Sequence, residues 1–68
     1  MANPIFKKID VVGTSTSSFS EAAANAIAKA GETVRNISWF EVVEQRGSVM
    51  EGMIQQYQTT VRIGFRVE

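Results

Sequence analysis

The chain has 68 residues, of which seven are basic, seven are acidic and 44% are hydrophobic, so its formal net charge is zero. A neutral chain lacks the excess positive charge with which proteins bind nucleic acid or anionic membranes. It contains neither cysteine nor histidine, which excludes disulfides and thiol chemistry and removes the commonest metal ligand and the usual general base near neutral pH.

The first predicted element is a half-buried strand over residues 5–12, in which apolar residues recur around Lys7, Lys8 and Asp10. Residues 13–18 then break the pattern. Their glycine and hydroxyl side chains satisfy local backbone groups, which is typical of a turn.

The second element is a helix that begins at a capping box. The Ser18 hydroxyl can accept from the amide of Glu21, and the Glu21 carboxylate can reach back to the amide of Ser18. The following segment is rich in alanine, the best helix former, and we extend it to about Val34. Apolar residues at three- and four-residue spacing form one stripe for packing on a sheet: Phe19, Ala23, Ala26, Ile27, Ala30 and Val34. Asn25, Lys29 and Glu32 lie off the stripe and should face solvent.

Two strands complete the chain. The first starts at Asn36, runs to Gly47 and carries Trp39, the only tryptophan. Gly47, Ser48 and Gly52 predict a connecting loop of several residues rather than a tight two-residue turn. The last strand, residues 53–67, alternates between a mainly apolar and a mainly polar face.

The order strand, helix, strand, strand predicts an α+β fold in one domain, residues 1–68, with a three-stranded antiparallel sheet packed on one helix. One helix covers only one face of the sheet. On the last strand we expect the covered face to show Tyr57, Val61, Ile63 and Phe65 and the other to show Gln58, Arg62 and Arg66. On the strand before it, strict alternation groups Trp39 with Ile37, Glu41 and Val43, and Phe40 with Ser38 and Val42.

Both faces are therefore partly apolar, and exposed apolar surface on a small protein usually marks a partner or a ligand. A chain of this length buries only about 60% of its unfolded surface, and without disulfides or a metal it can gain stability by association. We therefore expect a homo-oligomer. No apolar run is long enough to span a membrane and no leader opens the chain, which favours a soluble cytoplasmic protein.

Taken singly, the polar side chains carry little information. Trp39 alone would be a core anchor or an interface residue, Gln58 a strand residue, and Arg46 and Arg66 solvated charges. The sequence offers no nucleophile beside a base, no carboxylate pair at a defined spacing and no phosphate-binding glycine loop. We therefore expect no catalytic residue, no metal ligand and no enzyme activity.

The ordered set of motifs is more specific, and it resembles the dodecins, a family of small flavin-binding proteins. The resemblance covers nearly the whole chain and rests on residues 6–9 (FKKI), 13–15 (GTS), the alanine-rich helix, 39–42 (WFEV), 46–47 (RG), 57–58 (YQ) and 64–68 (GFRVE). Residues 50–55 depart from it, and we assign them no function.

The resemblance implies a hollow homododecamer in which paired flavins stack between tryptophans at subunit interfaces. By position, Trp39 matches the stacking tryptophan and Gln58 the glutamine that hydrogen-bonds the flavin edge. Arg46 and Arg66 match two bacterial arginines that favour a phosphorylated flavin, so FMN is expected before riboflavin or FAD. Binding of coenzyme A elsewhere on the shell is left open.

These residue types suit a flat, electron-poor ring. An indole stacks on it, an amide supplies both a donor and an acceptor to its edge, and a guanidinium pairs with phosphate. The resulting hypothesis is non-catalytic flavin storage with photoprotective quenching. One alternative is a small homo-oligomeric enzyme that binds an anionic metabolite at an intersubunit pocket through Arg46, Arg66 and Glu44. Another is a purely structural shell whose arginines pair with Glu41 or Glu44.

Overall fold

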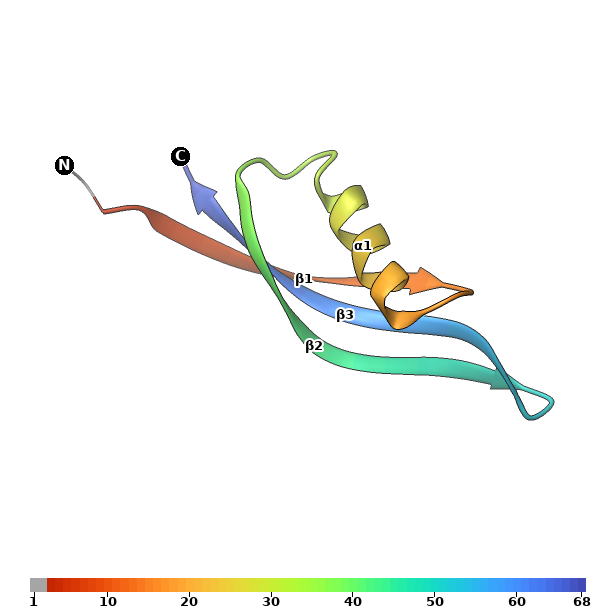
Figure 1. Cartoon of the computed structure of the whole chain (residues 1–68). Helices are drawn as coiled ribbons and strands as arrows, with labels where there is room; N and C mark the ends of the chain where they lie inside the picture. The colour runs from red at the N-terminus through yellow and green to blue at the C-terminus, as the bar shows by residue number, and fades with distance from the viewer. Residues whose placement is uncertain (1–2) are drawn as a thin grey trace.

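The computed structural model describes residues 3–68 and confirms the predicted α+β fold (Figure 1). Its elements follow the chain as β1 (Ile5–Ser15), α1 (Phe19–Ala30), β2 (Ile37–Met50) and β3 (Met53–Val67). The three strands form one sheet in the order β1-β3-β2, and β3 pairs antiparallel with both neighbours. The strand that comes last in sequence is therefore the central strand of the sheet.

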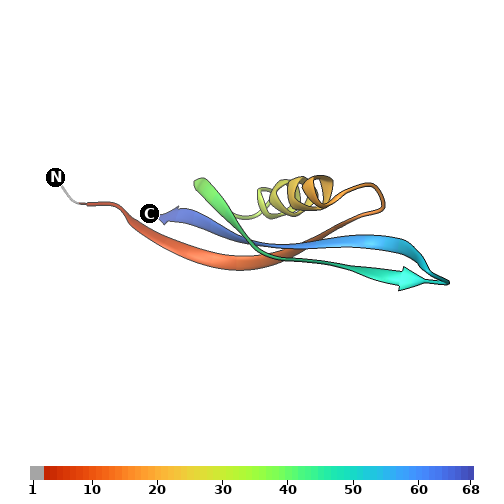
Figure 2. The same cartoon turned by 60° about the horizontal axis from the view of Figure 1, so that its bottom comes forward.

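The helix packs on one face of the sheet, over β1 and β3, and leaves the other face open (Figure 2). Its small side chains allow a close approach: Ala22, Ala23, Ala26 and Ala30 are buried against Val61 and Ile63. Ala22, which is absent from the predicted stripe, is fully buried. Asn25, Lys29 and Glu32 are exposed as predicted.

The alternation predicted for β3 is confirmed from Gln56 to Arg66; a register shift leaves Gln55 unpaired and reverses the faces of Met53 and Ile54. Thr59, Val61 and Ile63 are buried beneath the helix, while Gln58 and Arg62 on the opposite face are only partly covered. The one polar residue among the three is satisfied, because the Thr59 hydroxyl donates a 2.9 Å hydrogen bond to the carbonyl oxygen of Phe19. This bond ties the first turn of α1 to the central strand.

The capping box is half confirmed. The Ser18 hydroxyl accepts from the Glu21 amide at 3.0 Å. The Glu21 carboxylate does not reach back to Ser18; it accepts a 2.6 Å hydrogen bond from the Ser15 hydroxyl, whose oxygen in turn accepts from the amides of Ser17 and Ser18. The Ser15 hydroxyl, rather than the Glu21 carboxylate, therefore accepts the hydrogen bond from the Ser18 amide, because the end of β1 lies directly beside the helix start.

Three boundaries differ from those predicted. The helix ends at Ala30 rather than near Val34, because the chain beyond it tightens into three-residue turns, in which the Glu32 and Thr33 amides donate to the carbonyl oxygens of Lys29 and Ala30. The strand predicted to begin at Asn36 begins one residue later, and Asn36 itself has a positive φ of 63°. β1 continues through the predicted turn residues to Ser15, because these residues pair with β3 as far as Tyr57.

The predicted loop between the last two strands is wrong. β2 and β3 form one long hairpin closed by a two-residue turn, with Met50 directly opposite Met53. Glu51 and Gly52 have φ values of 53° and 76°, and positive values at both positions are typical of the tight turns that match strand twist. Gly47 and Ser48, taken as loop residues, lie within β2.

Two irregularities in β2 change which side chains share a face. The register of β2 against β3 shifts between Ile37 and Trp39 and again between Val42 and Glu44. Each shift inserts one residue and reverses the alternation after it. Ile37 therefore packs against the core, whereas Trp39 lies on the open face, which corrects the grouping predicted by strict alternation.

Candidate functional site

The sheet face without the helix, here called the open face, carries every predicted site residue. The pairing register places the even-numbered residues of β3 from Gln56 to Arg66 on it, together with their partners on the edge strands. Its members are Phe6, Lys8, Asp10, Val12 and Thr14 from β1, Trp39, Glu41, Glu44, Arg46 and Ser48 from β2, and Gln56, Gln58, Thr60, Arg62, Gly64 and Arg66 from β3.

Trp39 lies across the backbone of the central strand. It is opposite Gly64 in the register, and a Cβ added to Gly64 would lie only 2.6 Å from the indole Cδ2 and closer still to two other ring atoms. Phe6 packs against the indole edge-on, with ring centroids 5.0 Å apart and planes at 61°. The indole is thus supported from beneath and from one side, and it remains partly exposed.

We predict that Gly64→Ala displaces the indole, because the new methyl group would occupy the space of the ring. Overpacking of this kind costs about 1–3 kcal/mol, and the indole can avoid part of that cost only by leaving its position. A red shift of tryptophan emission, together with weaker ligand binding in an intact fold, would confirm the displacement. Emission identical to that of the unmodified chain would contradict it.

Arg46 and Gln58 form a second group on the open face. They face each other across β2 and β3, and the Arg46 Nε donates to the Gln58 Oε1 at 2.7 Å. The Gln58 Nε2 donates to Gln56 Oε1 at 2.8 Å. These bonds fix the direction of the Gln58 amide, and the second proton on its nitrogen remains free to pair with a ligand.

Arg66 lies at the opposite end of the open face. It is opposite Phe6 in the register and lines a recess of about 340 Å³ with Pro4, Phe6, Asn36, Ile37 and Ser38. Only two positions along β3 separate it from Gly64, so Arg66 is close to the indole rather than to Arg46.

The four predicted site residues therefore form two groups within one chain. Trp39 and Arg66 lie at one end of the open face, and Arg46 and Gln58 lie at the other. Gly64, the residue under Trp39, lies six positions along β3 from Gln58, which corresponds to about 20 Å at roughly 3.3 Å per residue. A single chain does not bring the stacking ring and the hydrogen-bonding amide together.

Two ion pairs occupy the space between these groups. Arg62 binds Asp10 through two hydrogen bonds, from Nε at 2.8 Å and from Nη2 at 3.1 Å, and Lys8 contacts Glu41 at 3.2 Å. All four side chains are 41–48% exposed. They join the three strands, and their opposite charges cancel in the middle of the face.

The pKa of Asp10 lies below its ordinary value, first because Arg62 hydrogen-bonds the carboxylate and then because the charges of Arg62 and Lys8 favour its ionised form. A carboxylate with a depressed folded pKa adds stability above its unfolded pKa of about 3.9 and loses that contribution as pH falls through the folded value. We predict that Asp10→Asn flattens the dependence of Tm on pH below about 4. Thermal melts of both proteins over this range would test the prediction, and parallel curves would contradict it.

Several residues of this face are not identified by sequence reasoning alone. Phe6 supports the indole and Gly64 makes room for it, but neither is predicted to have that role. A glycine inside a long strand often marks the close approach of another group, so Gly64 was the available signal. The pairs of Asp10 with Arg62 and of Lys8 with Glu41 depend on strand register, for which the sequence holds no local signal.

Comparison with known proteins identifies the family. The dodecin family model matches residues 5–68. A dodecin of Thermus thermophilus is 41% identical over 64 residues, covering 94% of this chain and 93% of that protein. The solved structure of a dodecin from Streptomyces davaonensis has a TM-score of 0.94 at 40% identity and covers 98% of both chains. The calcium dodecin of Mycobacterium tuberculosis has a TM-score of 0.82 at 34% identity and covers 94% of this chain and 91% of that one.

The family that these comparisons match consists of small, multimeric binding proteins. The chain belongs to the dodecin family. Within residues 3–68, no group of three or more acidic side chains is arranged to hold a metal ion, and no helix is long and apolar enough to cross a membrane.

Proposed function

We propose that this protein binds and stores flavin, FMN in particular, and quenches its photochemistry without catalysing a reaction. The observation that carries the proposal is the position of Trp39, a partly exposed indole supported by the Gly64 backbone and the Phe6 edge. A flat aromatic surface held in this way is suited to stacking on a planar ring, because its rotation is already restricted before the ligand arrives.

A bound flavin would supply a planar, electron-poor ring system that absorbs visible light. Trp39 would stack on that ring and, after excitation, donate an electron to it and take the electron back. No net chemistry results from this exchange. Of the acidic groups on the open face, Asp10 and Glu41 are held in ion pairs, which favours storage and protection over turnover.

The two groups on the open face imply that two copies of the chain build one site. Trp39 of one copy would stack on the ring, and Gln58 of another would hydrogen-bond its edge, with the amide direction set by Arg46. Arg66, close to the indole, would pair with the phosphate of FMN. Because Trp39 and Gln58 are about 20 Å apart along β3, neither copy alone completes the site.

This arrangement fits the wider proposal of a hollow homododecamer in the cytoplasm, with each copy folded as one domain. Charge neutrality in the middle of the open face, where the Lys8–Glu41 and Asp10–Arg62 pairs cancel, would let copies approach without repulsion there. Coenzyme A remains a candidate for a second ligand elsewhere on the shell.

Titrating the apoprotein with riboflavin, FMN and FAD while recording flavin fluorescence tests the proposal. We expect fluorescence to be lost on binding and FMN to bind more tightly than riboflavin. Arg66→Ala should remove that preference, since a charged hydrogen bond contributes roughly 1.5–3 kcal/mol, while Lys7→Ala, on the helix side of β1, should retain it. Unchanged fluorescence with all three flavins would refute the proposal, and turnover of an anionic metabolite without flavin would favour the enzyme alternative.

A further inference from the structure

Gln56 lies on the open face two positions before Gln58, and it is opposite Ser48 of β2 in the register. Residues two apart on a strand point to the same side of the sheet, so the two glutamine amides are neighbours. Gln56 is partly exposed. Among residues 3–68, its side chain makes one hydrogen bond, and the partner is the Gln58 amide.

The chemistry of Arg46 determines which end of each amide is the oxygen. A guanidinium carries donors only, so the Gln58 atom that Arg46 Nε meets at 2.7 Å must be the oxygen. The nitrogen of Gln58 is then at the other end of the amide, and the Gln56 atom that it meets at 2.8 Å must be an acceptor. Arg46, Gln58 and Gln56 therefore form a chain of hydrogen bonds that can run in one direction only.

The bond to Gln56 restricts a motion that the bond from Arg46 leaves open. Arg46 holds the Gln58 oxygen at one point, about which the plane of the amide can still rotate. The torsion that turns a glutamine amide has a broad energy minimum, so the side chain does little to hold its own plane. With Gln56 holding the nitrogen as well, both ends of the planar amide are fixed.

The two bonds also limit what Gln58 can offer to a ligand. An amide has two N–H protons and two lone pairs on its oxygen. One of each is used within the chain of hydrogen bonds, which leaves one donor and one acceptor. An imide edge, in which a carbonyl oxygen lies next to a ring N–H, can pair with both, and the pyrimidine ring of a flavin has such an edge.

We propose that Gln56 is a positioning residue, which fixes the plane of the Gln58 amide and thereby makes the site selective for ligands with an imide edge. Gln56 acts through Gln58 and does not touch the ligand itself. This inference rests on the flavin binding proposed above, whereas the chain of hydrogen bonds is already present in the unliganded protein.

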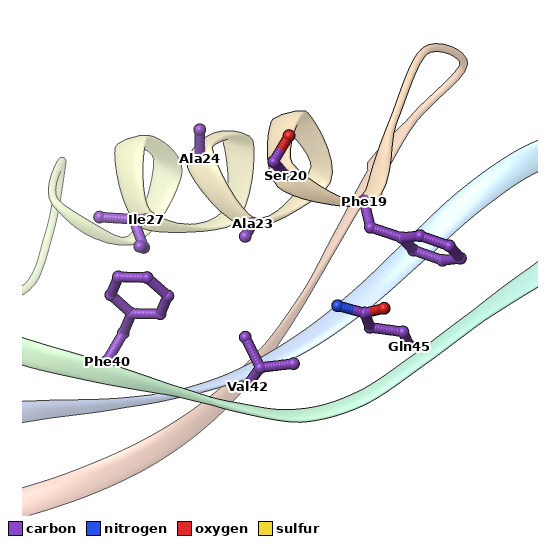
Figure 3. A pocket seen from close by; sticks show the side chains of 8 residues that line it. All are labelled: Phe19, Ser20, Ala23, Ala24, Ile27, Phe40, Val42 and Gln45. Atoms are coloured by element: carbon purple, nitrogen blue, oxygen red, sulfur yellow. The ribbon is translucent and has the colours of Figure 1, made fainter.

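Substitutions of Gln56 test this role by fluorescence titration with FMN. Gln56→Leu removes the acceptor and should weaken binding about fivefold, which corresponds to one neutral hydrogen bond. Gln56→Glu keeps an acceptor and should bind FMN within about twofold of the unmodified protein. The matched control is Gln45→Leu, whose affinity should be unchanged, because Gln45 lies on the helix side of the sheet (Figure 3). Equal affinities of Gln56→Leu and the unmodified protein would overturn the proposal.

A double substitution separates positioning from a direct contact and from a general effect on the fold. Because Gln56 acts through Gln58, Gln56→Leu should cause no further loss of FMN affinity in a protein that already carries Gln58→Leu. A further loss in that background would show that Gln56 acts on the ligand or the fold by another route, and it would refute the positioning role.

FMN methylated on the imide nitrogen tests the selectivity, because this probe lacks the ring N–H. The unmodified protein should prefer FMN to the methylated probe, and Gln56→Leu should reduce that preference by about threefold or more. An equal preference in the two proteins would show that Gln56 does not set the selectivity.

The position of the amide can be measured without a ligand. A hydrogen bond shifts the NMR signal of the proton that makes it, so the two Nε2 protons of Gln58 should be further apart in the unmodified and Gln56→Glu proteins than in Gln56→Leu. Equal separations in all three would refute the role of Gln56. The expected separations without any binding of FMN to the unmodified protein would instead refute flavin binding, and with it the selectivity, while the chain of hydrogen bonds would stand.

Discussion

Replacing Trp39 with alanine should reduce flavin affinity by thirtyfold or more. The substitution removes an aromatic surface whose stacking contributes about 0.5–1.5 kcal/mol beyond the area that it buries, and the lost burial brings the expected total to at least about 2 kcal/mol. It also removes the electron donor, so the fluorescence of any flavin that still binds should recover. Fluorescence titration and excited-state lifetimes measure the two effects separately.

Assembly should largely survive the Trp39 substitution, because the most exposed apolar side chains, among them Ile5, Val49 and Met53, are left unchanged. Trp39→Phe is the matched control: it keeps a flat ring above Gly64 with a smaller area and should show an intermediate loss of affinity. Equal affinities of the Ala variant and the unmodified protein would eliminate the stacking role.

Replacing Gly13 with alanine should have the largest effect on folding. A Cβ at this position would lie 2.7 Å from the Cβ of Ala26 and closer still to the carbonyl oxygen of Ala22. Neither obstacle is the end of a flexible side chain, so α1 would have to move away from β1 and open the contact that the alanine stripe makes with the sheet. We expect a loss of about 3 kcal/mol, which lowers Tm by roughly 12–24 °C in a chain of this size.

The matched control for Gly13 is Gly31→Ala. Gly31 has a φ of −64°, an ordinary helical value, and a new Cβ would meet its nearest neighbour, the carbonyl oxygen of Ile27, at 3.3 Å. Its Tm should change little or rise slightly, because alanine restricts the unfolded chain more than glycine does. Equal melting temperatures for Gly13→Ala and Gly31→Ala would contradict the close approach of the helix to β1.

The parts of the fold that depend on local periodicity could be predicted from the sequence. The alternation of β3 correctly separates Val61 and Ile63 from Gln58 and Arg62, since a strand turns successive side chains to opposite faces. The spacing of the alanines likewise identifies the helix face that packs on the sheet. Both signals lie within one element and need no knowledge of its partners.

The arrangement of the candidate site could not be predicted in the same way. Strict alternation would place Trp39 and Arg46 on opposite faces, because they lie an odd number of positions apart along the chain. The irregularity between Val42 and Glu44 reverses the alternation and brings both to the open face. Such an insertion is determined by pairing with β3, so it leaves no mark in the sequence of β2 alone.

Because β3 is the central strand, it fixes the spacing between the groups that it contributes to the core and to the open face. The same run of residues provides the backbone under the indole at Gly64, the buried contacts of Val61 and Ile63, and the Gln58 amide. Residues 58 and 64 are an even number of positions apart, so both lie on the open face of the sheet. Lengthening the interval by a single residue would turn the amide toward the helix, whereas lengthening it by two would keep the side and change only the span. Evolution can therefore vary the length of this interval only in even steps if both groups are to serve one ligand surface.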